Sequence, residues 1–148
     1  MSRDFVFIVS GGRTGTQYFG DLMGEMIEGA HSVHEPDLAS PWEPARMARA
    51  IRQFGLWHMV IGRVLGRTGI RNIATRRLRG RIDTQAAIAA IRRQRDGYYA
   101  SLSAPLIVES YYQWAGLLPE LRALHPTARI IGIVRDPRDL VAQPRRPP

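Results

Sequence analysis

The chain has 148 residues, 45% of them hydrophobic, so it is long enough for one folded domain with a real core. It contains no cysteine, which excludes disulfides, thiolate zinc sites and thiol nucleophiles. The formal net charge is +8 and every cation is an arginine, so a standard Walker A motif, which needs a lysine, is excluded. No stretch reaches the ~20 apolar residues of a membrane span and no signal-peptide pattern opens the chain, so we expect a cytoplasmic protein.

The first predicted unit is a strand, a glycine turn and a helix. Residues 5–9 form a short apolar run, typical of a strand buried on both faces, and the glycine-rich loop 11–16 follows it. A predicted helix then covers 17–27. Such a turn presents backbone N–H groups at the positive end of a helix dipole, and Arg13 adds a cation, so the loop is predicted to bind an anion.

A second short strand is predicted over residues 31–36, and it ends in two titratable side chains. His34 and Glu35 stand at its C-terminal end, and Pro36 stops it. Because successive strand residues point to opposite faces, we expect only one of His34 and Glu35 to enter a site there.

An arginine-rich helical segment follows. Ser40 is predicted to cap a helix that runs to about residue 53, with Glu43 completing a capping box. Residues 46–95 hold 13 arginines against one acid, and glycines near 55, 66–69 and 80 divide them into helices. The clearest helix begins at Asp83 and is expected to end at Gly97. Two interpretations remain open: solvated helix faces, or a basic wall for an acidic glycan, an acidic lipid surface or nucleic acid.

Two further strands complete the pattern. Residues 105–110 and 129–135 are strand candidates, and the helical stretch 111–125 between them is expected to break at Pro119. Strands that alternate with helices predict a single α/β domain with a mainly parallel sheet and a helical insertion at about 41–97. Ligands gather at the C-terminal ends of parallel strands, which would place Arg135 near the glycine loop.

Two segments together carry a family resemblance. S-G-G-R-T-G-T at 10–16 and I-I-G-I-V-R-D-P-R-D-L-V at 130–141 resemble the two nucleotide-binding signatures of the sulfotransferases that use 3′-phosphoadenosine 5′-phosphosulfate (PAPS). The segments H-E-P at 34–36 and V-E-S at 108–110 are similar to those of the bacterial members. The resemblance implies a P-loop-like three-layer fold and transfer of a sulfuryl group from PAPS, without a metal, to a hydroxyl or amine of a carbohydrate, lipid or small molecule.

The resemblance also implies roles for single residues. Arg13 would contact the 5′-phosphosulfate and stabilise the leaving group, Arg135 would contact the 3′-phosphate, and Glu35 would be the general base, with His34 and Glu109 as alternatives. Glu109 could instead pair with an arginine. The loop that holds the 5′-phosphate would comprise Gly12, Arg13, Thr14, Gly15, Thr16 and Gln17.

The sequence departs from the family pattern in two places. Gln143 stands where the family has a serine on the 3′-phosphate, and the family continues for roughly another hundred residues beyond that point. We therefore expect the N-terminal part of a sulfotransferase, with the activity of this chain alone left open. A sheet cut short would expose apolar surface and favour homo-oligomers. The alternatives are a P-loop nucleotide kinase-like enzyme and a basic nucleic-acid-binding protein.

Overall fold

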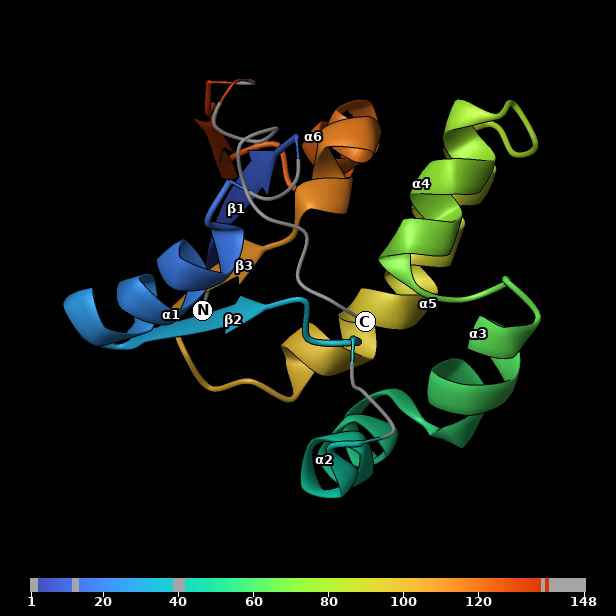
Figure 1. Cartoon of the computed structure of the whole chain (residues 1–148), viewed down its shortest axis with the longest axis horizontal. Coiled ribbons are helices and arrows are strands. Elements are labelled where there is room, and N and C mark those ends of the chain that lie inside the picture. The colour runs from blue at the N-terminus through green and yellow to red at the C-terminus, as the bar shows by residue number, and fades with distance from the viewer. Residues whose placement is uncertain (1–2, 12–13, 39–41, 137, 139–148) are drawn as a thin grey trace.

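The computed structural model describes residues 3–11, 14–38, 42–136 and 138, which form an α/β fold around a four-stranded sheet (Figure 1). All three strand pairs are parallel, as expected from the sequence, and the strand order is β2-β3-β1-β4. The strands are β1 (Asp4–Ser10), β2 (Ala30–His34), β3 (Leu106–Ser110) and β4 (Arg129–Ile133).

Six α-helices and two irregular helical turns connect the strands. The helices are α1 (Thr16–Met26), α2 (Pro44–Phe54), α3 (Gly62–Val64), α4 (Ile70–Leu78), α5 (Thr84–Ala100) and α6 (Leu118–Leu124). A π-helical turn, η1 (Trp57–Ile61), leads into α3, and a 3₁₀ helix, η2 (Tyr112–Leu117), leads into α6. Figure 1 shows α1 beside the sheet, whereas α2, α3 and α4 lie in the part of the molecule away from it.

Successive side chains of β1 point to opposite faces of the sheet. Phe7 and Val9 face the large core, where they meet Ile73 of α4, Ile91 of α5 and Trp114 of η2. The ring of Phe7 meets that of Trp114 edge-on at 5.6 Å between centroids. The helices between β2 and β3 therefore share one hydrophobic core with the sheet.

The opposite face of the sheet is covered by α1, through close contacts at two glycines. A Cβ on Gly20 would lie 3.1 Å from the His34 Cβ and 3.2 Å from the Ser110 Cβ, and one on Gly24 would lie 3.3 Å from the Ser32 Cβ. The Ser32 hydroxyl also donates a hydrogen bond to the Gly20 carbonyl. These small residues let α1 lie almost directly on β2 and β3, which fixes the position of its N-terminus.

The predicted breaks in the helical segment are confirmed, since Gly55, Gly69 and Gly80 all have positive φ angles at helix ends. One predicted boundary in this segment was wrong. The second helix begins at Pro44, with Glu43 as its N-cap residue, and the Glu43 side chain accepts from Arg46 instead of making a capping hydrogen bond. Ser40 and Pro41 lie outside the described residues.

Four other predictions concern helix and strand ends. Asp83 caps α5 as expected, accepting a 2.7 Å hydrogen bond from the Ala86 N–H. The helix continues past Gly97 to Ala100, because Tyr98 and Tyr99 are buried and favour another turn. The last strand ends at Ile133 rather than residue 135. The break at Pro119 is confirmed, since η2 gives way to α6 there.

Candidate functional site

The C-terminal ends of β1 and β4 lie side by side. In their parallel pairing Ser10 is opposite Ile133, so the chain leaves both strands at one edge of the sheet. From β1 it passes into the glycine loop, and from β4 into Val134 and Arg135. Arg135 is half-buried. The next residue, Asp136, pairs with Arg138 at 2.8 Å between Nη2 and Oδ2.

The glycine loop leads directly into α1. Gly12 and Arg13 lie outside the described residues, whereas Thr14, Gly15, Thr16 and Gln17 lie within them. Gly15 precedes the helix with φ 90°, a conformation that a side chain would strain, and it supplies no side-chain cap. The first N–H groups of α1 therefore keep their donor capacity, and its first turn holds no acidic residue.

Thr14 contributes a polar atom to the same loop that is buried without a partner. Its Oγ1 makes no hydrogen bond within the described part of the chain. A buried hydroxyl without a partner is costly, since it has lost its water. Within the described residues, this region thus combines backbone N–H groups without a side-chain cap and a hydroxyl without a partner.

Glu35 follows β2 in a strained backbone conformation. Its φ of 45° is in the left-handed region, which glutamate rarely adopts, and the residue is only 8% exposed. Its N–H donates to the Ser110 carbonyl at 3.1 Å, which ties the turn to β3. Burial and the nearby Asp37 carboxylate raise the pKa of Glu35, against the opposing effect of Arg71. A carboxyl whose pKa is raised toward neutrality is suited to accept and release a proton.

The prediction that His34 and Glu35 point to opposite faces was wrong. Glu35 lies after the last residue of β2 with a left-handed backbone, so the alternation of strand side chains does not extend to it. The His34 Nε2 lies 3.9 Å from the Glu35 Oε1. Burial lowers the pKa of His34, with smaller opposing effects from nearby groups, so its imidazole is neutral at pH 7.

Ser110 connects this histidine to the glycine loop. Its hydroxyl donates a 2.6 Å hydrogen bond to the Thr16 carbonyl and lies 3.4 Å from the His34 Nδ1. Because its single proton goes to Thr16, the hydroxyl can only accept from His34, which requires the Nδ1–H tautomer. The Nε2 lone pair of His34 then faces Glu35. Polar contacts therefore link the end of β2, the end of β3 and the start of α1.

Glu109, the alternative base, is fully buried and belongs to a different group of contacts. Its carboxylate accepts from the Arg95 Nη2 at 3.0 Å, the Tyr99 hydroxyl at 2.6 Å and the Trp114 Nε1 at 3.1 Å. The sequence allowed Glu109 to be either a general base or the partner of an arginine, and in the structure it pairs with an arginine. That arginine, Arg95, is not on a solvated helix face but is 1% exposed.

Asp37 completes this buried cluster. Its Oδ1 accepts a 3.0 Å hydrogen bond from the Arg95 Nη2, and its Oδ2 lies 3.6 Å from the His58 Nε2. Burial alone would raise the pKa of Asp37, but the charge of Arg95 and the contact with His58 hold it well below its usual range. We call Asp37, Arg95 and Glu109 the buried triad. It joins the turn after β2, helix α5 and strand β3.

The sequence reasoning did not find Asp37 and Arg95. Asp37 had a local signal, since an acid two residues after Glu35 continues the polar turn beyond the strand. Arg95 had none, because it is one of 13 arginines in the 46–95 segment and nothing in the spacing separates it from the exposed ones. Tyr98, Tyr99, Tyr111 and Trp114 are core residues.

A small cavity of about 230 Å³ opens next to His34, between β2 and α2. His31, His34 and Pro36 line it from the strand side, and Arg46 and Arg49 line it from α2. In the described ranges, no three His, Asp or Glu side chains are grouped so as to hold a metal ion. None of the helices in those ranges is long and apolar enough to cross a membrane.

Comparisons with known proteins give no match for this chain among protein-family models, curated proteins or solved structures.

Proposed function

We propose that this chain is a sulfotransferase domain, which moves a sulfuryl group from PAPS to a hydroxyl or amine of an acceptor. The single observation that supports this most is the pairing of β1 with β4. It brings the two segments that resemble the family's nucleotide signatures to one edge of the sheet. A nucleotide with phosphates at both its 5′ and 3′ positions needs two such anion sites.

The architecture supports a P-loop-like assignment for the domain. β1 continues into α1 on one face of the sheet, whereas the adjacent β3 continues into η2 and α6 on the other. Neighbouring strands whose connections leave on opposite faces create a crevice at their C-terminal ends, where α/β proteins bind ligands. The glycine loop follows β1 and Glu35 follows β2, and both strands pair in parallel with β3, so both lie at this edge of the sheet.

The donor side of the reaction depends on the glycine loop. The N–H groups at the start of α1 and the Thr14 hydroxyl would hold the 5′-phosphate, and Arg135 would hold the 3′-phosphate. Arg13, which lies outside the described residues, would neutralise charge on the leaving phosphate. PAPS itself supplies the sulfuryl group and a good leaving group.

The acceptor side depends on Glu35. As the acceptor oxygen or nitrogen bonds to sulfur, the bond from sulfur to the 5′-phosphate oxygen breaks, and Glu35 takes the acceptor's proton. The cavity beside His34, with Arg46 and Arg49 in its wall, would take the end of the acceptor that reacts. Its size suits a small head group, so the rest of a larger acceptor would lie outside it.

A titration calorimetry experiment tests the proposal. We expect adenosine 3′,5′-bisphosphate (PAP) to bind more tightly than ATP, and Arg135→Ala to weaken PAP binding by roughly 10–100-fold, the loss of a charged hydrogen bond. Arg129→Ala is the matched control, because Arg129 is exposed at the opposite end of the same strand. It should bind PAP like the unchanged chain.

Other outcomes identify the alternatives. ATP binding in preference to PAP favours a nucleotide kinase-like enzyme, and DNA binding with a steep salt dependence but no PAP binding favours a nucleic-acid-binding protein. PAP binding without transfer to any acceptor favours a domain that needs further chain for catalysis.

A further inference from the structure

The segment from Trp42 to Arg67 exposes an unusual amount of apolar surface. Trp42 is 91% exposed and Val64 is 85% exposed. Four more large apolar side chains of this segment are more than 40% exposed: Leu56, Trp57, Ile61 and Leu65. A concentration of exposed apolar side chains in one segment indicates a place where something else is bound.

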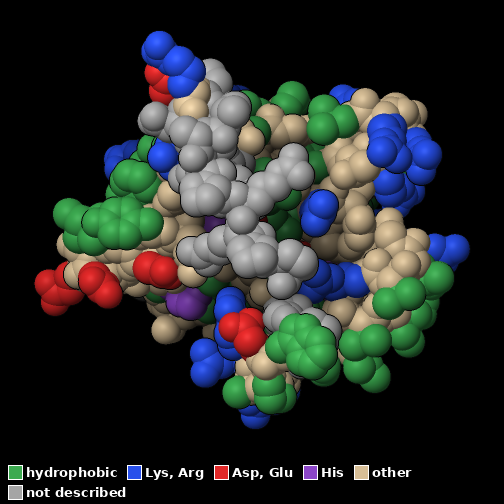
Figure 2. Space-filling model, in the orientation of Figure 1, with side chains coloured by type: hydrophobic (Ala, Val, Ile, Leu, Met, Phe, Trp, Pro, Cys, Tyr) green, Lys and Arg blue, Asp and Glu red, His purple; other side chains and the backbone are tan. Residues whose placement is uncertain are grey.

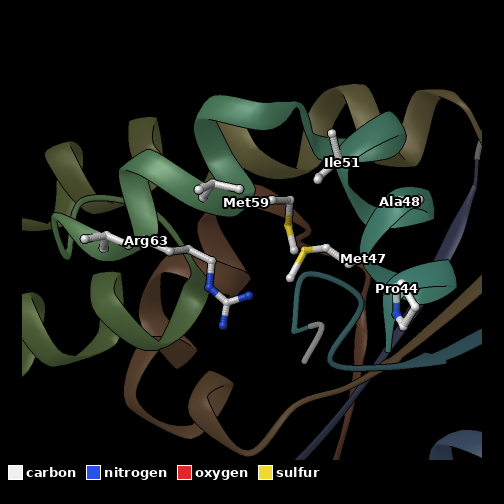
Figure 3. Close-up of a pocket in the computed structure, with 8 residues that line it drawn as sticks. Pro44, Met47, Ala48, Ile51, Met59 and Arg63 are labelled. Carbon is white, nitrogen blue, oxygen red and sulfur yellow. The ribbon is translucent and has the colours of Figure 1, made fainter. Parts of the chain in front are cut away.

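An apolar groove of about 750 Å³ opens within the same segment, between α2 and the η1–α3 turn. Met47 and Ile51 line it from α2, and Met59 and Val64 line it from the other side. Figure 3 shows Met47 and Met59 facing each other across the groove. Among the described residues that line it, Arg63 alone is charged, and its guanidinium donates a 2.8 Å hydrogen bond to the Asp37 carbonyl. Flexible methionines suit a groove that must fit a chain of variable shape.

A second concavity, of about 760 Å³, is lined by arginines. We call it the arginine basin. It lies between the end of α3, helix α4 and helix α5, and the described part of the chain contributes no carboxylate to its lining. Its arginines are Arg67, Arg76, Arg79, Arg81 and Arg93. Like charges in one concave surface repel one another, so an anion in the basin would stabilise it.

The groove and the basin adjoin through consecutive residues. Val64 lines the groove, whereas Leu65 and Arg67 line the basin. Toward the right-hand edge of the space-filling view, over α3 and α4, apolar and arginine side chains accordingly lie close to one another (Figure 2). One surface therefore offers an apolar groove and a cationic basin next to each other.

We propose that this surface docks on a lipid bilayer that contains anionic phospholipids. The arginines of the basin would bind the head groups, while Val64, Leu65 and Trp57, which lines a neighbouring pocket with Arg67, would enter the region between head groups and acyl chains. Nucleic acid or an acidic polysaccharide would satisfy the basin but leave these aliphatic side chains in water. A second copy of the chain would cover them, but it would bring two arginine basins together.

Vesicle flotation tests the proposal with the whole chain. We expect the chain to bind vesicles of phosphatidylcholine and phosphatidylglycerol in a ratio of about 70:30, and to bind vesicles of phosphatidylcholine alone only weakly. Binding should also shift the tryptophan emission to the blue. Removing one arginine from such a surface lowers the partition coefficient about fivefold, so Arg79→Ser/Arg81→Ser should lower it about 25-fold. Val64→Ser/Leu65→Ser should lower it while leaving the salt dependence in place.

Matched controls change the same residue types elsewhere. Arg122→Ser on α6 and Val134→Ser after β4 alter exposed side chains outside this surface, and we expect both to bind vesicles like the unchanged chain. The two double variants, in contrast, change residues that line the groove or the basin. Circular dichroism checks that each variant is folded.

Several results would overturn the proposal. Equal binding to neutral and anionic vesicles would remove the role of the arginines, and unchanged binding of both double variants would place the contact elsewhere. Binding of an oligonucleotide or heparin without binding to anionic vesicles would assign the basin to another polyanion. A stable dimer that loses its association on Val64→Ser/Leu65→Ser would assign the apolar surface to a second copy.

Discussion

Replacing Arg95 with methionine should strongly destabilise the fold. Arg95 is the only cation in hydrogen-bond contact with two buried carboxylates, Asp37 and Glu109, among the residues that the structure describes. Methionine fills most of the same volume but leaves both carboxylates buried without their counter-charge. Breaking a buried pair in this way costs about 3–5 kcal/mol, a large part of the 5–15 kcal/mol that stabilises a typical domain.

Urea unfolding followed by circular dichroism measures this loss. With a slope of about 1–3 kcal/mol per molar urea, the unfolding midpoint should fall by at least ~1 M. Arg92→Met is the matched control, since Arg92 is an exposed arginine on the same helix. An Arg95→Met midpoint that moves no further than the Arg92→Met midpoint would refute the idea that the buried triad holds α5 to the sheet.

The pH dependence gives an independent check with a definite sign. In the unchanged chain the pKa of Asp37 is held below its unfolded value, so its stabilisation is present above about pH 4 and is lost as the pH falls further. Without Arg95, burial would instead raise the pKa of Asp37 above the unfolded value, so stability would decrease as the pH rises through about 4. The stability difference between Arg95→Met and the unchanged chain should therefore be smaller at pH ~4.5 than at pH ~7.

Three further predictions follow from single residues. Glu35→Gln should abolish sulfuryl transfer without weakening PAP binding. In a pH–rate profile of the unchanged chain, activity should fall as the pH drops through the raised pKa of Glu35. Gly20→Ala should lower the unfolding free energy by about 1–3 kcal/mol, because the new Cβ meets β2 and β3. Gly97→Ala should raise the unfolding free energy by about 0.5–1 kcal/mol, because the space around Gly97 is open. Melting temperatures of the two variants that shift in the same direction would contradict this. Asp83→Ala should cost about 1 kcal/mol through loss of the α5 cap, measured by the same melts, and an unchanged melting temperature would count against that cap.

The sequence predicted the sheet well because its strands are short apolar runs bounded by strong turn residues. Residues 5–9 and 105–110 fall within one residue of β1 and β3. The helical boundaries were harder to predict, because Pro41 and Pro44 both suit a first helical turn and local pattern does not choose between them. Burial of Tyr98 and Tyr99 carried α5 past Gly97, and that tertiary effect has no local signal.

The candidate site could be predicted only as separate pieces. The glycine loop, Glu35 and Arg135 each follow a recognisable strand, so their place at strand ends could be expected. Their neighbours depend on strand order, which the sequence did not determine. The approach of His34 to Glu35 required a left-handed glutamate, and the burial of Arg95 required two carboxylates from distant segments, so neither could be inferred from spacing.

The strand order has a consequence for how the chain folds as it is made. β1 and β2 are synthesised first but are not neighbours, and both pair with β3. His34, at the end of β2, contacts Ser110, which lies 76 positions later in the chain. At ~5–20 residues per second, the ribosome needs about 4–15 s to synthesise the residues between them. During that time the apolar β1 has no strand to pair with, so the nascent chain should depend on chaperones until β3 emerges.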